Sequence, residues 1–534
     1  MSRLEEHPFL DKNSLFTLLK ERFLGEEKKL SHIPNPALLI DAEKAAKKIA
    51  HAIQNNKHIT LVGDYDVDGV SSTAIMVDFF RQIPYPLEAI IPNRFSDGYG
   101  VSPTILERID TDLIITVDNG ITAREAARIC QERGIELIIT DHHTPSDELP
   151  LAHAIVDPKL PECRYPFKEI CGAQVAWLLL ALVKKELSLS IDMRQFLDIL
   201  CIAIIADIMP LIDINRTLVK EGLNLIMRSG RPASIIIRDF LNKSSITSED
   251  IAFNIAPRIN SAGRLEDASI ALKFFTATST HEAYTQFEKL SALNEQRKET
   301  EALTTQEAIA QVEMLEMLPD VLVVAGEGWH EGVVGIVASR LVDKYSRPAI
   351  VLSIDGSHAK GSARSLGEVN IYDLLDANEH FLEKFGGHKM AAGLSILTEA
   401  IAPFSQAINQ SAAALDRSDF LPKEKVLGII QSDAIDFELL SILEYFEPYG
   451  EANPRPSFLM KDAEILSITP MGKERSHCRI SVRQFPHERK PLELILFRQV
   501  LEMPEDRRLT CSYTLSKNEF NSKVSLQLLI NKIY

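Results

Sequence analysis

Short apolar runs alternate with helical patterns between residues 50 and 157, and this alternation constrains the fold more than any other feature of the chain. Four runs have the length and apolar composition of buried strands: Ile59–Val62, Leu113–Val117, Glu136–Thr140 and Ala154–Val156. Helical patterns follow the first two, from about Ser71 to Phe80 and from Thr122 to Arg133. Alternation of this kind predicts parallel βαβ units, so we expect an α/β fold whose main domain contains a parallel sheet.

Polar residues follow three of these strands at the point where each strand is expected to end. They are, in chain order, Asp64, Asp66, Asp68, Asp118, Asp141, His142 and His143. In an extended segment alternate side chains share a face, which would bring the three aspartates of the first group together. In open parallel sheets, binding and catalysis occur beyond the carboxyl ends of the strands. We therefore expect these side chains to converge at one edge of the sheet.

A cluster of carboxylates and imidazoles predicts a metal centre, although a solvated acidic turn would also explain the first three aspartates. Carboxylates at close range repel one another unless a cation lies among them. Mixed carboxylate and imidazole ligands suit cations such as Mn²⁺, and the absence of thiolates argues against structural zinc. The carboxylates outnumber the needs of one ion, which predicts two ions sharing an aspartate, an arrangement suited to in-line displacement at phosphorus.

Three further residues bear on this centre. Asp207, at the end of a buried helical pattern, is a candidate ligand. One of the two adjacent histidines is a candidate general acid or phosphoryl contact, with a hydrogen-bonding role behind the ligands as the alternative. Asp157 also ends a strand, but the proline after it indicates a turn, and it is left outside the predicted centre.

The composition limits the class of protein. A chain of 534 residues is too long for one ordinary core, so roughly three or four domains are expected. The net charge of −17 argues against a generic nucleic-acid coat, but a confined basic groove is compatible with it. The six cysteines form no C-x-x-C pair, which indicates reduced thiols in a cytoplasmic protein.

No membrane segment is expected. The chain starts without an apolar signal core. Its most apolar stretch, Phe196–Ile212, is interrupted by Asp198 and Asp207 and is short for a bilayer span. We interpret this stretch as a buried helix that runs into an acidic loop.

The remaining patterns predict a four-part organisation. The stretch from about Ser279 to Leu318 lacks Gly and Pro and is too polar for a core helix, which predicts a long helix joining two domains; two shorter helices are the alternative. A second α/β unit begins near Val321, and short alternating runs after Lys425 predict a small β-barrel. The predicted parts are 1–278 (parallel-sheet domain with an N-terminal helical extension), 279–318 (connecting helix), 319–415 (smaller α/β domain) and 425–534 (β domain).

Basic residues gather in segments that also contain glycine. Glycine allows close approach of the backbone to a ligand, and arginine binds phosphate through two parallel hydrogen bonds. In an acidic protein such segments predict a phosphate-binding surface. For Arg94, a solvent-exposed charge without a ligand is the alternative. The candidate residues are Arg94, Arg258, Asn260, Arg264, Ser362, Arg364, Gly387 and His388.

The motifs around the predicted metal centre resemble a known superfamily. Gly-Asp-Tyr-Asp-Val-Asp-Gly (63–69), Val-Asp-Asn-Gly (117–120) and Thr-Asp-His-His (140–143) together resemble the DHH phosphoesterases, and Ala-Asp-x-x-Pro-Leu (206–211) resembles their fourth motif. Gly-Gly-His-x-x-Ala-Ala-Gly (386–393) is similar to the DHHA1 domain that follows in many members.

Further segments narrow the resemblance to the RecJ family of bacterial exonucleases. These are Pro-Arg-Ile-Asn-x-Ala-Gly-Arg (257–264), Ser-Ala-Arg-Ser (362–365) and the final β domain, which is similar to an OB fold. The resemblance implies a 5′-to-3′ exonuclease specific for single-stranded DNA, which hydrolyses phosphodiester bonds to release 5′-mononucleotides in DNA repair and recombination. It also suggests a helicase and a single-strand-binding protein as partners, and a monomer is expected.

The resemblance also implies roles for individual residues. The ligands of two Mn²⁺ or Mg²⁺ ions would be Asp64, Asp66, Asp68, Asp118, His142 and Asp207. His143 would face the scissile phosphate, and Asp141 would support the two histidines. Strand phosphates, including a 5′ end, would be held by Arg94, Arg264, Ser362, Arg364 and His388.

Two alternatives belong to other functional classes. The first is a phosphodiesterase of the same superfamily that acts on short oligonucleotides or cyclic dinucleotides, and such relatives are usually shorter or carry sensor domains in front. The second is a non-enzymatic scaffold, which the presence of every motif carboxylate disfavours. Spacing alone does not give the polarity of digestion, which rests on the resemblance.

Overall fold

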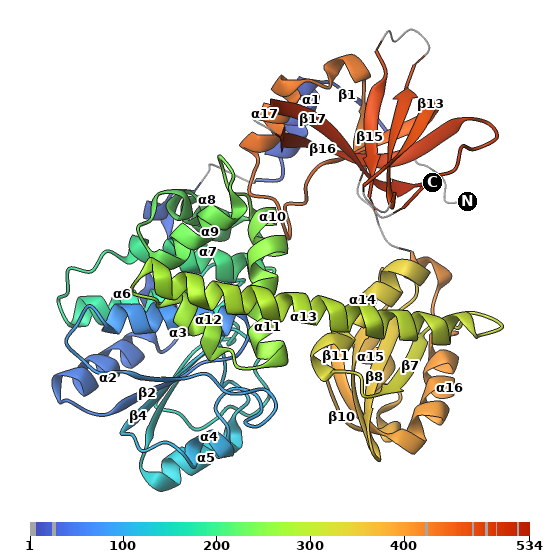
Figure 1. Ribbon diagram of the computed structural model, residues 1–534. Helices are drawn as coiled ribbons and strands as arrows, with labels where there is room; N and C mark the ends of the chain where they lie inside the picture. Colours follow the sequence, from blue (N-terminus) through green and yellow to red (C-terminus); the bar gives the residue numbers. More distant parts are fainter. Residues whose placement is uncertain are drawn as a thin grey trace. The chain divides into compact units, whose positions relative to one another are not determined.

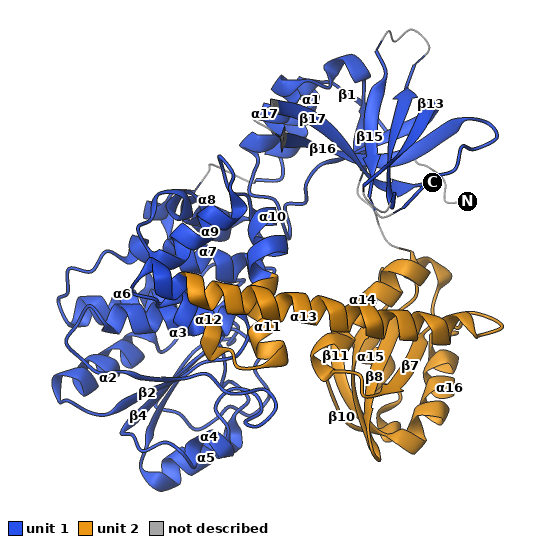
Figure 2. Cartoon of the chain, in the orientation of Figure 1, with its two compact units in different colours: residues 1–256, 272–283, 425–534 blue, residues 257–271, 284–424 orange. Residues whose placement is uncertain are grey.

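The computed structural model describes residues 7–23, 28–421, 426–472, 475–485, 490–497, 499–520 and 523–534 (Figure 1). The chain divides into two compact units (Figure 2). The first comprises residues 1–256, 272–283 and 425–534, and the second comprises residues 257–271 and 284–424.

The first unit contains a five-stranded parallel sheet with the strand order β3-β2-β4-β5-β6. Its strands are β2 (Ile59–Val62), β3 (Glu88–Ile90), β4 (Leu113–Val117), β5 (Glu136–Thr140) and β6 (Ala154–Val156). The four predicted strands are therefore confirmed. The sequence analysis missed β3 because this edge strand is only three residues long, is partly exposed and begins with a glutamate.

Helices cover both faces of this sheet (Figure 1). α4 (Pro103–Leu106) and α5 (Arg124–Arg133) pack on one face, where Ile114 and Ile139 belong to the same buried cluster as Ala126. α2 (Ala42–Gln54), α3 (Val67–Phe80) and α6 (Gly172–Glu186) lie on the other face. Because both faces are buried, the strands are continuous apolar runs without alternation.

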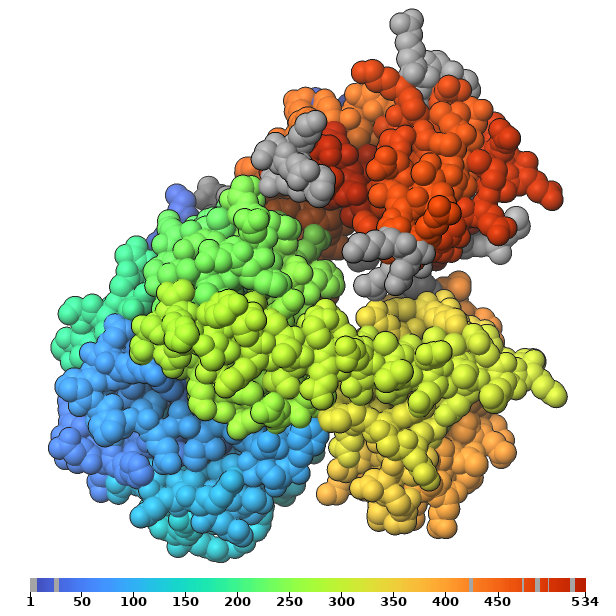
Figure 3. All heavy atoms as spheres, viewed as in Figure 1, coloured from blue at the N-terminus to red at the C-terminus, as the bar shows by residue number. Residues whose placement is uncertain are grey.

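A layer of further helices extends this domain, and in the space-filling view its teal and green atoms adjoin the blue ones (Figure 3). It consists of α7 (Leu197–Ala206), α8 (Asp213–Arg228), α9 (Pro232–Leu241) and α10 (Ser248–Asp250), followed by a π-helical turn over Ile251–Ile255. The predicted buried helix within Phe196–Ile212 is confirmed as α7, in which every residue but Asp198 is apolar and every residue up to Ile205 is buried.

The second unit carries a mixed sheet of the order β10-β11-β9-β8-β7, in which only β7 and β8 are parallel. Its strands are β7 (Leu322–Glu327), β8 (Ala349–Asp355), β9 (His358–Arg364), β10 (Leu382–His388) and β11 (Ala391–Leu397). Its helices are α11 (Ala256–Leu265), α14 (Glu331–Tyr345), α15 (Ile371–Asp376) and α16 (Ile401–Ala412), and α12 (Ser269–Phe275) lies at the division between the units.

The long helix is unbroken, as predicted. α13 runs over Thr280–Glu313, so the alternative of two shorter helices is wrong. The part of α13 that belongs to the second unit packs there through Ala308 and Val312, which lie in one apolar cluster with Val337 of α14.

The C-terminal part is a β domain. Its strands are β12 (Val426–Ile430), β13 (Ser457–Met471), β14 (His477–Arg483), β15 (Leu492–Leu496), β16 (Arg508–Phe520) and β17 (Lys523–Ile533), with α17 (Phe437–Tyr445) packed against them. The strand pairings run from β13 through β14, β15, β17 and β16 back to β13. The predicted OB-like domain thus has a ring of paired strands.

The first described residues pack into this C-terminal domain. β1 (Phe9–Leu10) pairs in parallel with β12, with Phe9 opposite Ile429. Leu15 and Leu19 of α1 (Lys12–Lys20) are fully buried in the core of the C-terminal domain. The sequence patterns instead predict that this segment belongs to the parallel-sheet domain, because nothing in a local pattern indicates a pairing between the two ends of a chain.

Among the described residues, no helix combines the length and the apolar composition needed to cross a bilayer.

The packing of α1 gives a stability prediction. Leu15→Ala leaves a cavity in the C-terminal core and is expected to lower its free energy of unfolding by about 2–4 kcal/mol. Thr17→Ala, at an exposed position of the same helix, is expected to change it by less than about 0.5 kcal/mol. Hydrogen exchange of β13 and β16 amides under denaturant measures both. Equal effects of the two substitutions would contradict the docking of α1 in this core.

Candidate metal centre and phosphate-binding residues

The loop after β2 presents its aspartates from three different local structures. Asp64 lies in the loop, Asp66 is the N-cap of α3, and Asp68 lies in the first turn of α3. The Asp66 carboxylate accepts a hydrogen bond of 3.0 Å from the Gly69 amide. The expected extended segment through Asp68 is therefore wrong, because capping by Asp66 starts the helix at Val67 rather than near Ser71.

Asp68 is held by a second helix. Its two carboxylate oxygens accept hydrogen bonds from the Gly172 and Ala173 amides at 2.6 and 2.9 Å. These amides form the N-terminus of α6, where unpaired N–H groups and the helix dipole favour a negative charge. Asp68 is therefore fixed in position although it is only 1% exposed.

Asp118 follows β4 in a left-handed conformation with φ = 63°. The next residue, Asn119, donates hydrogen bonds to the carbonyls of Val62 and Val117 at 3.1 and 2.8 Å, which ties the ends of β2 and β4 together. A Cβ at Gly172 would lie 2.5 Å from the Asp118 carboxylate oxygen Oδ1, so the start of α6 accommodates Asp118 only because position 172 is glycine.

The end of β5 carries the two histidines on a buried aspartate. Asp141 Oδ1 accepts hydrogen bonds from the backbone amides of His142 and His143 at 2.8 and 3.1 Å, and lies 2.7 Å from His143 Nδ1. Its other oxygen accepts from the Ile121 amide at 2.9 Å. Asp141 therefore orients both histidines.

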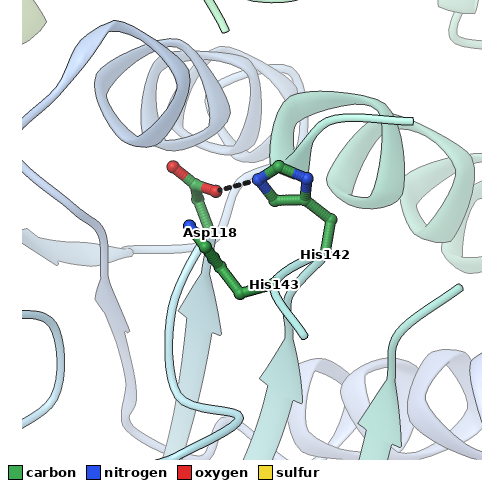
Figure 4. Close-up of side chains that lie close together, drawn as sticks. All are labelled: Asp118, His142 and His143. Carbon is green, nitrogen blue, oxygen red and sulfur yellow. Dashed lines mark ion pairs between the residues drawn. The ribbon is translucent and has the colours of Figure 1, made fainter. Parts of the chain in front are cut away.

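His142 connects the carboxylates of separate segments. Its Nε2 lies 3.2 Å from Asp118 Oδ1 and 3.6 Å from oxygens of both Asp68 and Asp207. Figure 4 shows the Asp118 carboxylate facing the His142 ring, each from the end of a neighbouring strand. Asp207 reaches the cluster from the C-terminal end of α7.

The ligand-capable atoms fall into three overlapping groups, each with its atoms within 4.8 Å of one another. The groups are Asp64, Asp66 and Asp118; Asp68, His142 and Asp207; and Asp118, His142 and His143. Asp118 belongs to two groups, so the arrangement suits two ions that share this carboxylate.

Buried polar atoms without partners support a metal fit. Within the described part of the chain, Asp64 Oδ1, Asp118 Oδ1, Asp207 Oδ2 and His142 Nδ1 are buried and have no hydrogen-bond partner. Buried polar atoms are otherwise nearly always satisfied. Three unsatisfied carboxylate oxygens that face one cluster are the donor set of Mn²⁺ or Mg²⁺, so the residues present fit such ions.

Electrostatics indicates the same need for a cation. Burial, followed by the charges of Asp68 and Asp66, raises the pKa of Asp207 to about 9. Burial and the neighbouring aspartates raise the pKa values of Asp64 and Asp118 well above the ordinary range. These carboxyls thus favour a proton unless a metal ion replaces it.

The two histidines differ in charge. Burial lowers the pKa of His142 to about 4, which keeps its ring neutral and able to act as a ligand. Burial would also lower the pKa of His143, but the hydrogen bond and charge of Asp141, aided by Asp207 and Asp66, raise it to about 9. His143 is therefore a cation at neutral pH at the edge of the cluster.

Arg94 lies beside the same cluster. Its guanidinium stands 4.6 Å above the ring of Tyr65, which follows Asp64 directly. Tyr65 in turn packs edge-on against Tyr99, and Tyr99 against His143. Of the predicted phosphate-binding residues, Arg94 is thus the one in the first unit.

The second unit brings three other candidates together. Arg264 donates a hydrogen bond of 3.0 Å to the Gly332 carbonyl in the first turn of α14. A Cβ at Gly335 would lie 2.9 Å from an Arg364 nitrogen and 3.2 Å from Ser362 Oγ. These side chains therefore surround the N-terminus of α14, which is a favourable place for a phosphate.

The remaining candidates lie on the same sheet or on α11. His388 pairs with Ala391, which pairs with Arg364 on the next strand, so His388 and Arg364 stand in one row of the sheet. Gly387 has φ = 148°, and a Cβ there would lie 2.4 Å from the Ala391 carbonyl. Arg258 donates to Ser291 of α13, and Asn260 is half-buried on α11.

Two residues that hold the candidate ligands in place are absent from the residues predicted from the sequence. Asn119 and Gly172 hold the candidate ligands in place but carry no charge. In the sequence, only their positions indicate them, Asn119 after a strand and Gly172 at the start of a helix. Asp157 is fully buried, its Oδ2 has no hydrogen-bond partner among the described residues, and burial raises its pKa to about 7. The turn that the following proline indicates is present, since the Lys159 amide donates a hydrogen bond of 2.7 Å to Asp157 Oδ1, and no ligand group among the described residues contains Asp157.

Family models match three parts of the chain. They are the DHH family N-terminal domain over residues 58–204, the DHHA1 domain over 318–414 and the RecJ OB domain over 428–532. Fold and metal cluster thus define a phosphoesterase of the DHH class.

Relatives refine this class. The single-stranded-DNA-specific exonuclease RecJ of Haemophilus influenzae is 34% identical, covering 99% of this chain and 96% of its own length. The same-named protein of Bacillus subtilis is 35% identical over 91% of this chain, which spans 62% of that longer relative. The crystal structure of Thermus thermophilus RecJ in complex with Mn²⁺ matches with a TM-score of 0.82 and 28% identity, covering all of this chain and 77% of that one. The chain belongs to the RecJ family.

The raised pKa values give a prediction for the metal-free protein. Asp207, with an ordinary value of 3.8, and His143, with an ordinary value of 6.5, both have folded pKa values of about 9. Between pH 6.5 and 9 the folded protein therefore binds more protons than the unfolded chain, and its stability falls as pH rises. Thermal melting in EDTA is expected to show a decreasing Tm across this range.

Mn²⁺ is expected to reverse the trend, because it replaces the protons and binds more tightly at high pH. The increase in Tm on adding Mn²⁺ should be larger at pH 8.5 than at pH 6.5. Asp207→Asn serves as the control and should reduce the slope of both profiles to the part that His143 contributes. A Tm in EDTA that rises with pH over this range would contradict the conclusion that the carboxyl cluster binds protons when no metal ion is present.

Proposed function

We propose that this protein is a single-stranded-DNA-specific exonuclease that hydrolyses phosphodiester bonds with two divalent cations, Mn²⁺ or Mg²⁺. The observation that carries the proposal is the set of three overlapping ligand groups, two of which contain Asp118, with buried carboxylate oxygens that have no hydrogen-bond partner among the described residues. The names of the RecJ relatives and the Mn²⁺ and Mg²⁺ complexes of T. thermophilus RecJ support the substrate and the ions.

Each ion is assigned a set of ligands. One ion would lie among Asp64, Asp66 and Asp118, and the other among Asp68, Asp118, His142 and Asp207. Bound ions supply a nucleophilic water and neutralise charge on the phosphate. Asn119 and the α6 N-terminus keep Asp118 and Asp68 at the distances these ions need.

His143 is proposed to act on the phosphate itself. Its raised pKa keeps a proton on the ring, and Asp141 fixes the ring through Nδ1. Nε2 is then the atom that can donate a proton to the leaving oxygen or hydrogen-bond a phosphoryl oxygen. Asp141 is thus a positioning residue for this step.

The phosphates of the strand are proposed to be held by the cationic groups in each unit. Arg94 would contact a phosphate near the metals. Arg264, Ser362 and Arg364, at the N-terminal end of α14, would form an anion site, and Gly387 and His388 lie on the same sheet as Ser362 and Arg364. Arg258 and Asn260 would contribute from α11. We assign the 5′ phosphate of the strand to the anion site of Arg264, Ser362 and Arg364. Binding of that end gives 5′-to-3′ digestion with release of 5′-mononucleotides. This activity would serve DNA repair and recombination.

The division of labour follows the predicted parts. Residues 1–278 would carry the chemistry, 319–415 the phosphate site, 279–318 the connection between them and 425–534 a surface for single strands. A monomer that works in the cytoplasm with a helicase and a single-strand-binding protein is proposed. Six buried cysteines, all free, suit a reducing compartment.

The central test replaces the shared ligand. Asp118→Asn retains a side chain that tolerates the left-handed backbone but removes the charge both ions need. Hydrolysis of a 5′-labelled single strand in Mn²⁺ is expected to fall by at least about 10³-fold. Glu125→Gln, on the exposed surface of α5, is the control. Wild-type-like rates in a folded Asp118→Asn protein would refute the metal assignment.

The substrate ends separate the exonuclease from the phosphodiesterase alternative. A linear single strand with a free 5′ end should be degraded to mononucleotides. A single-stranded circle, or a strand with a bulky 5′ block, should resist, and a 3′ block should have no effect. Activity confined to dinucleotides or cyclic dinucleotides would favour the alternative, and faster digestion from free 3′ ends would reverse the polarity.

A further inference from the structure

The loop that carries Asp207 has a strained backbone. Ile208 has φ = 55° and is 68% exposed. It ends α7 in the position where glycine is usual, with the Met209 amide donating to the Ile204 carbonyl at 3.1 Å. A β-branched residue in the left-handed region persists only when the surrounding structure holds it there. The loop therefore needs external support.

One support comes from within the parallel-sheet domain. Asn215, fully buried at the start of α8, donates a hydrogen bond of 3.1 Å to the Pro210 carbonyl. Its side-chain oxygen accepts a bond of 2.7 Å from Gln174 in the first turn of α6. The same turn of α6 holds Asp68. The hydrogen-bonded side chains of Asn215 and Gln174 thus connect the loop that carries Asp207 to the turn of α6 that holds Asp68.

The other support comes from the C-terminal domain. The Leu211 amide, four residues after Asp207, donates a hydrogen bond of 2.8 Å to the Glu451 carbonyl. Leu211 is 2% exposed, and a Cβ at Gly450 would lie 2.7 Å from its Cδ1. The backbone of the C-terminal domain therefore touches the loop at its last residue.

A docking segment, residues 445–455, maintains this contact and follows α17 (Figure 1). Arg455 makes a bidentate ion pair with Glu249 at 2.8 and 3.0 Å and a third bond of 3.1 Å to Glu447. Ser248 donates to the Tyr449 carbonyl at 2.5 Å. Arg216, next to Asn215, donates to the Glu447 carbonyl at 3.0 Å. These bonds surround the Leu211–Glu451 contact on both sides.

We propose that the C-terminal domain positions the metal ligand Asp207 through the Leu211–Glu451 bond, so that docking of residues 445–455 sets the affinity of the metal centre. The inference rests on the proposed role of Asp207 as a ligand. It gives the C-terminal domain an effect on the chemistry that is separate from any strand binding. Coupling of this kind is reciprocal, so metal binding also strengthens the docking.

The test weakens docking at a distance from the metals. In the full chain, Arg455→Met removes the ion pairs and keeps the aliphatic part of the side chain. Arg483→Met is the matched control, because Arg483 pairs with Glu464 on the neighbouring strand within the C-terminal domain. Mn²⁺ affinity is measured by paramagnetic resonance titration, without substrate, and hydrogen exchange reports on the Leu211 amide.

Arg455→Met is expected to raise the Kd for Mn²⁺ about 10-fold and to speed exchange of the Leu211 amide. Arg455→Lys, which keeps one ion pair, should give an intermediate Kd, and Arg483→Met should match the wild type. Should Arg455→Met fail to fold, Ser248→Ala, which removes one docking bond, must still raise the Kd measurably.

The opposite results overturn the proposal. A folded Arg455→Met protein whose Leu211 amide exchanges faster but whose Kd for Mn²⁺ is unchanged would show that docking does not position Asp207. Asp207→Asn separates this failure from failure of the proposed function. If Asp207→Asn binds Mn²⁺ as the wild type does, Asp207 is not a ligand and this inference falls, whereas the proposed function is tested separately at Asp118.

Discussion

Repulsion among buried carboxylates is the constraint on which the rest of the structure depends. Asp64, Asp68 and Asp118 are each at most 2% exposed and converge at the ends of β2 and β4. Without a counter-charge such a cluster would cost stability, since burial and mutual repulsion both disfavour the ionised forms. A bound divalent cation would supply the missing counter-charge, and the hydrogen bonds that hold the carboxylates in place surround the cluster.

The support is built mainly from the backbone. Asp68 is held by the α6 amides, and Asp141 is held by the backbone amides of His142 and His143. Asn119 ties the ends of β2 and β4 together through hydrogen bonds to their carbonyls. Backbone groups on helices and strands move little, so they hold the carboxylates at fixed distances without adding charge. The loop of Asp207 differs, because its strained backbone is supported from two sides, one of them the C-terminal domain.

Local patterns predicted much of the fold and the centre. β2, β4, β5 and β6 were found because strands buried on both faces are continuous apolar runs. Most candidate ligands were found because they follow such strands, whereas Asp207 was found at the end of a buried helical pattern. The start of α3 was placed too late, since capping by Asp66 overrides the expected extended segment. The edge strand β3 and the pairing of Phe9 with Ile429 depend on tertiary contacts that no local window contains.

The positioning residues were hidden for a different reason. Gly172 leaves room for Asp118, and Asn119 forms a hydrogen bond to the end of a neighbouring strand. These roles can be seen only when the segments are assembled. The turn predicted at Asp157 from the following proline is present, although the burial of this aspartate was not expected. The resemblance of the motifs to the RecJ family supplied the substrate class and the polarity, which geometry alone does not give.

Anomalous diffraction from crystals grown with Mn²⁺ tests the central claim most directly. The account predicts two peaks roughly 3.5–4 Å apart, with the Asp118 carboxylate between them and His142 Nε2 bound to one. A single peak away from Asp118, or none at the ends of β2, β4 and β5, would contradict it.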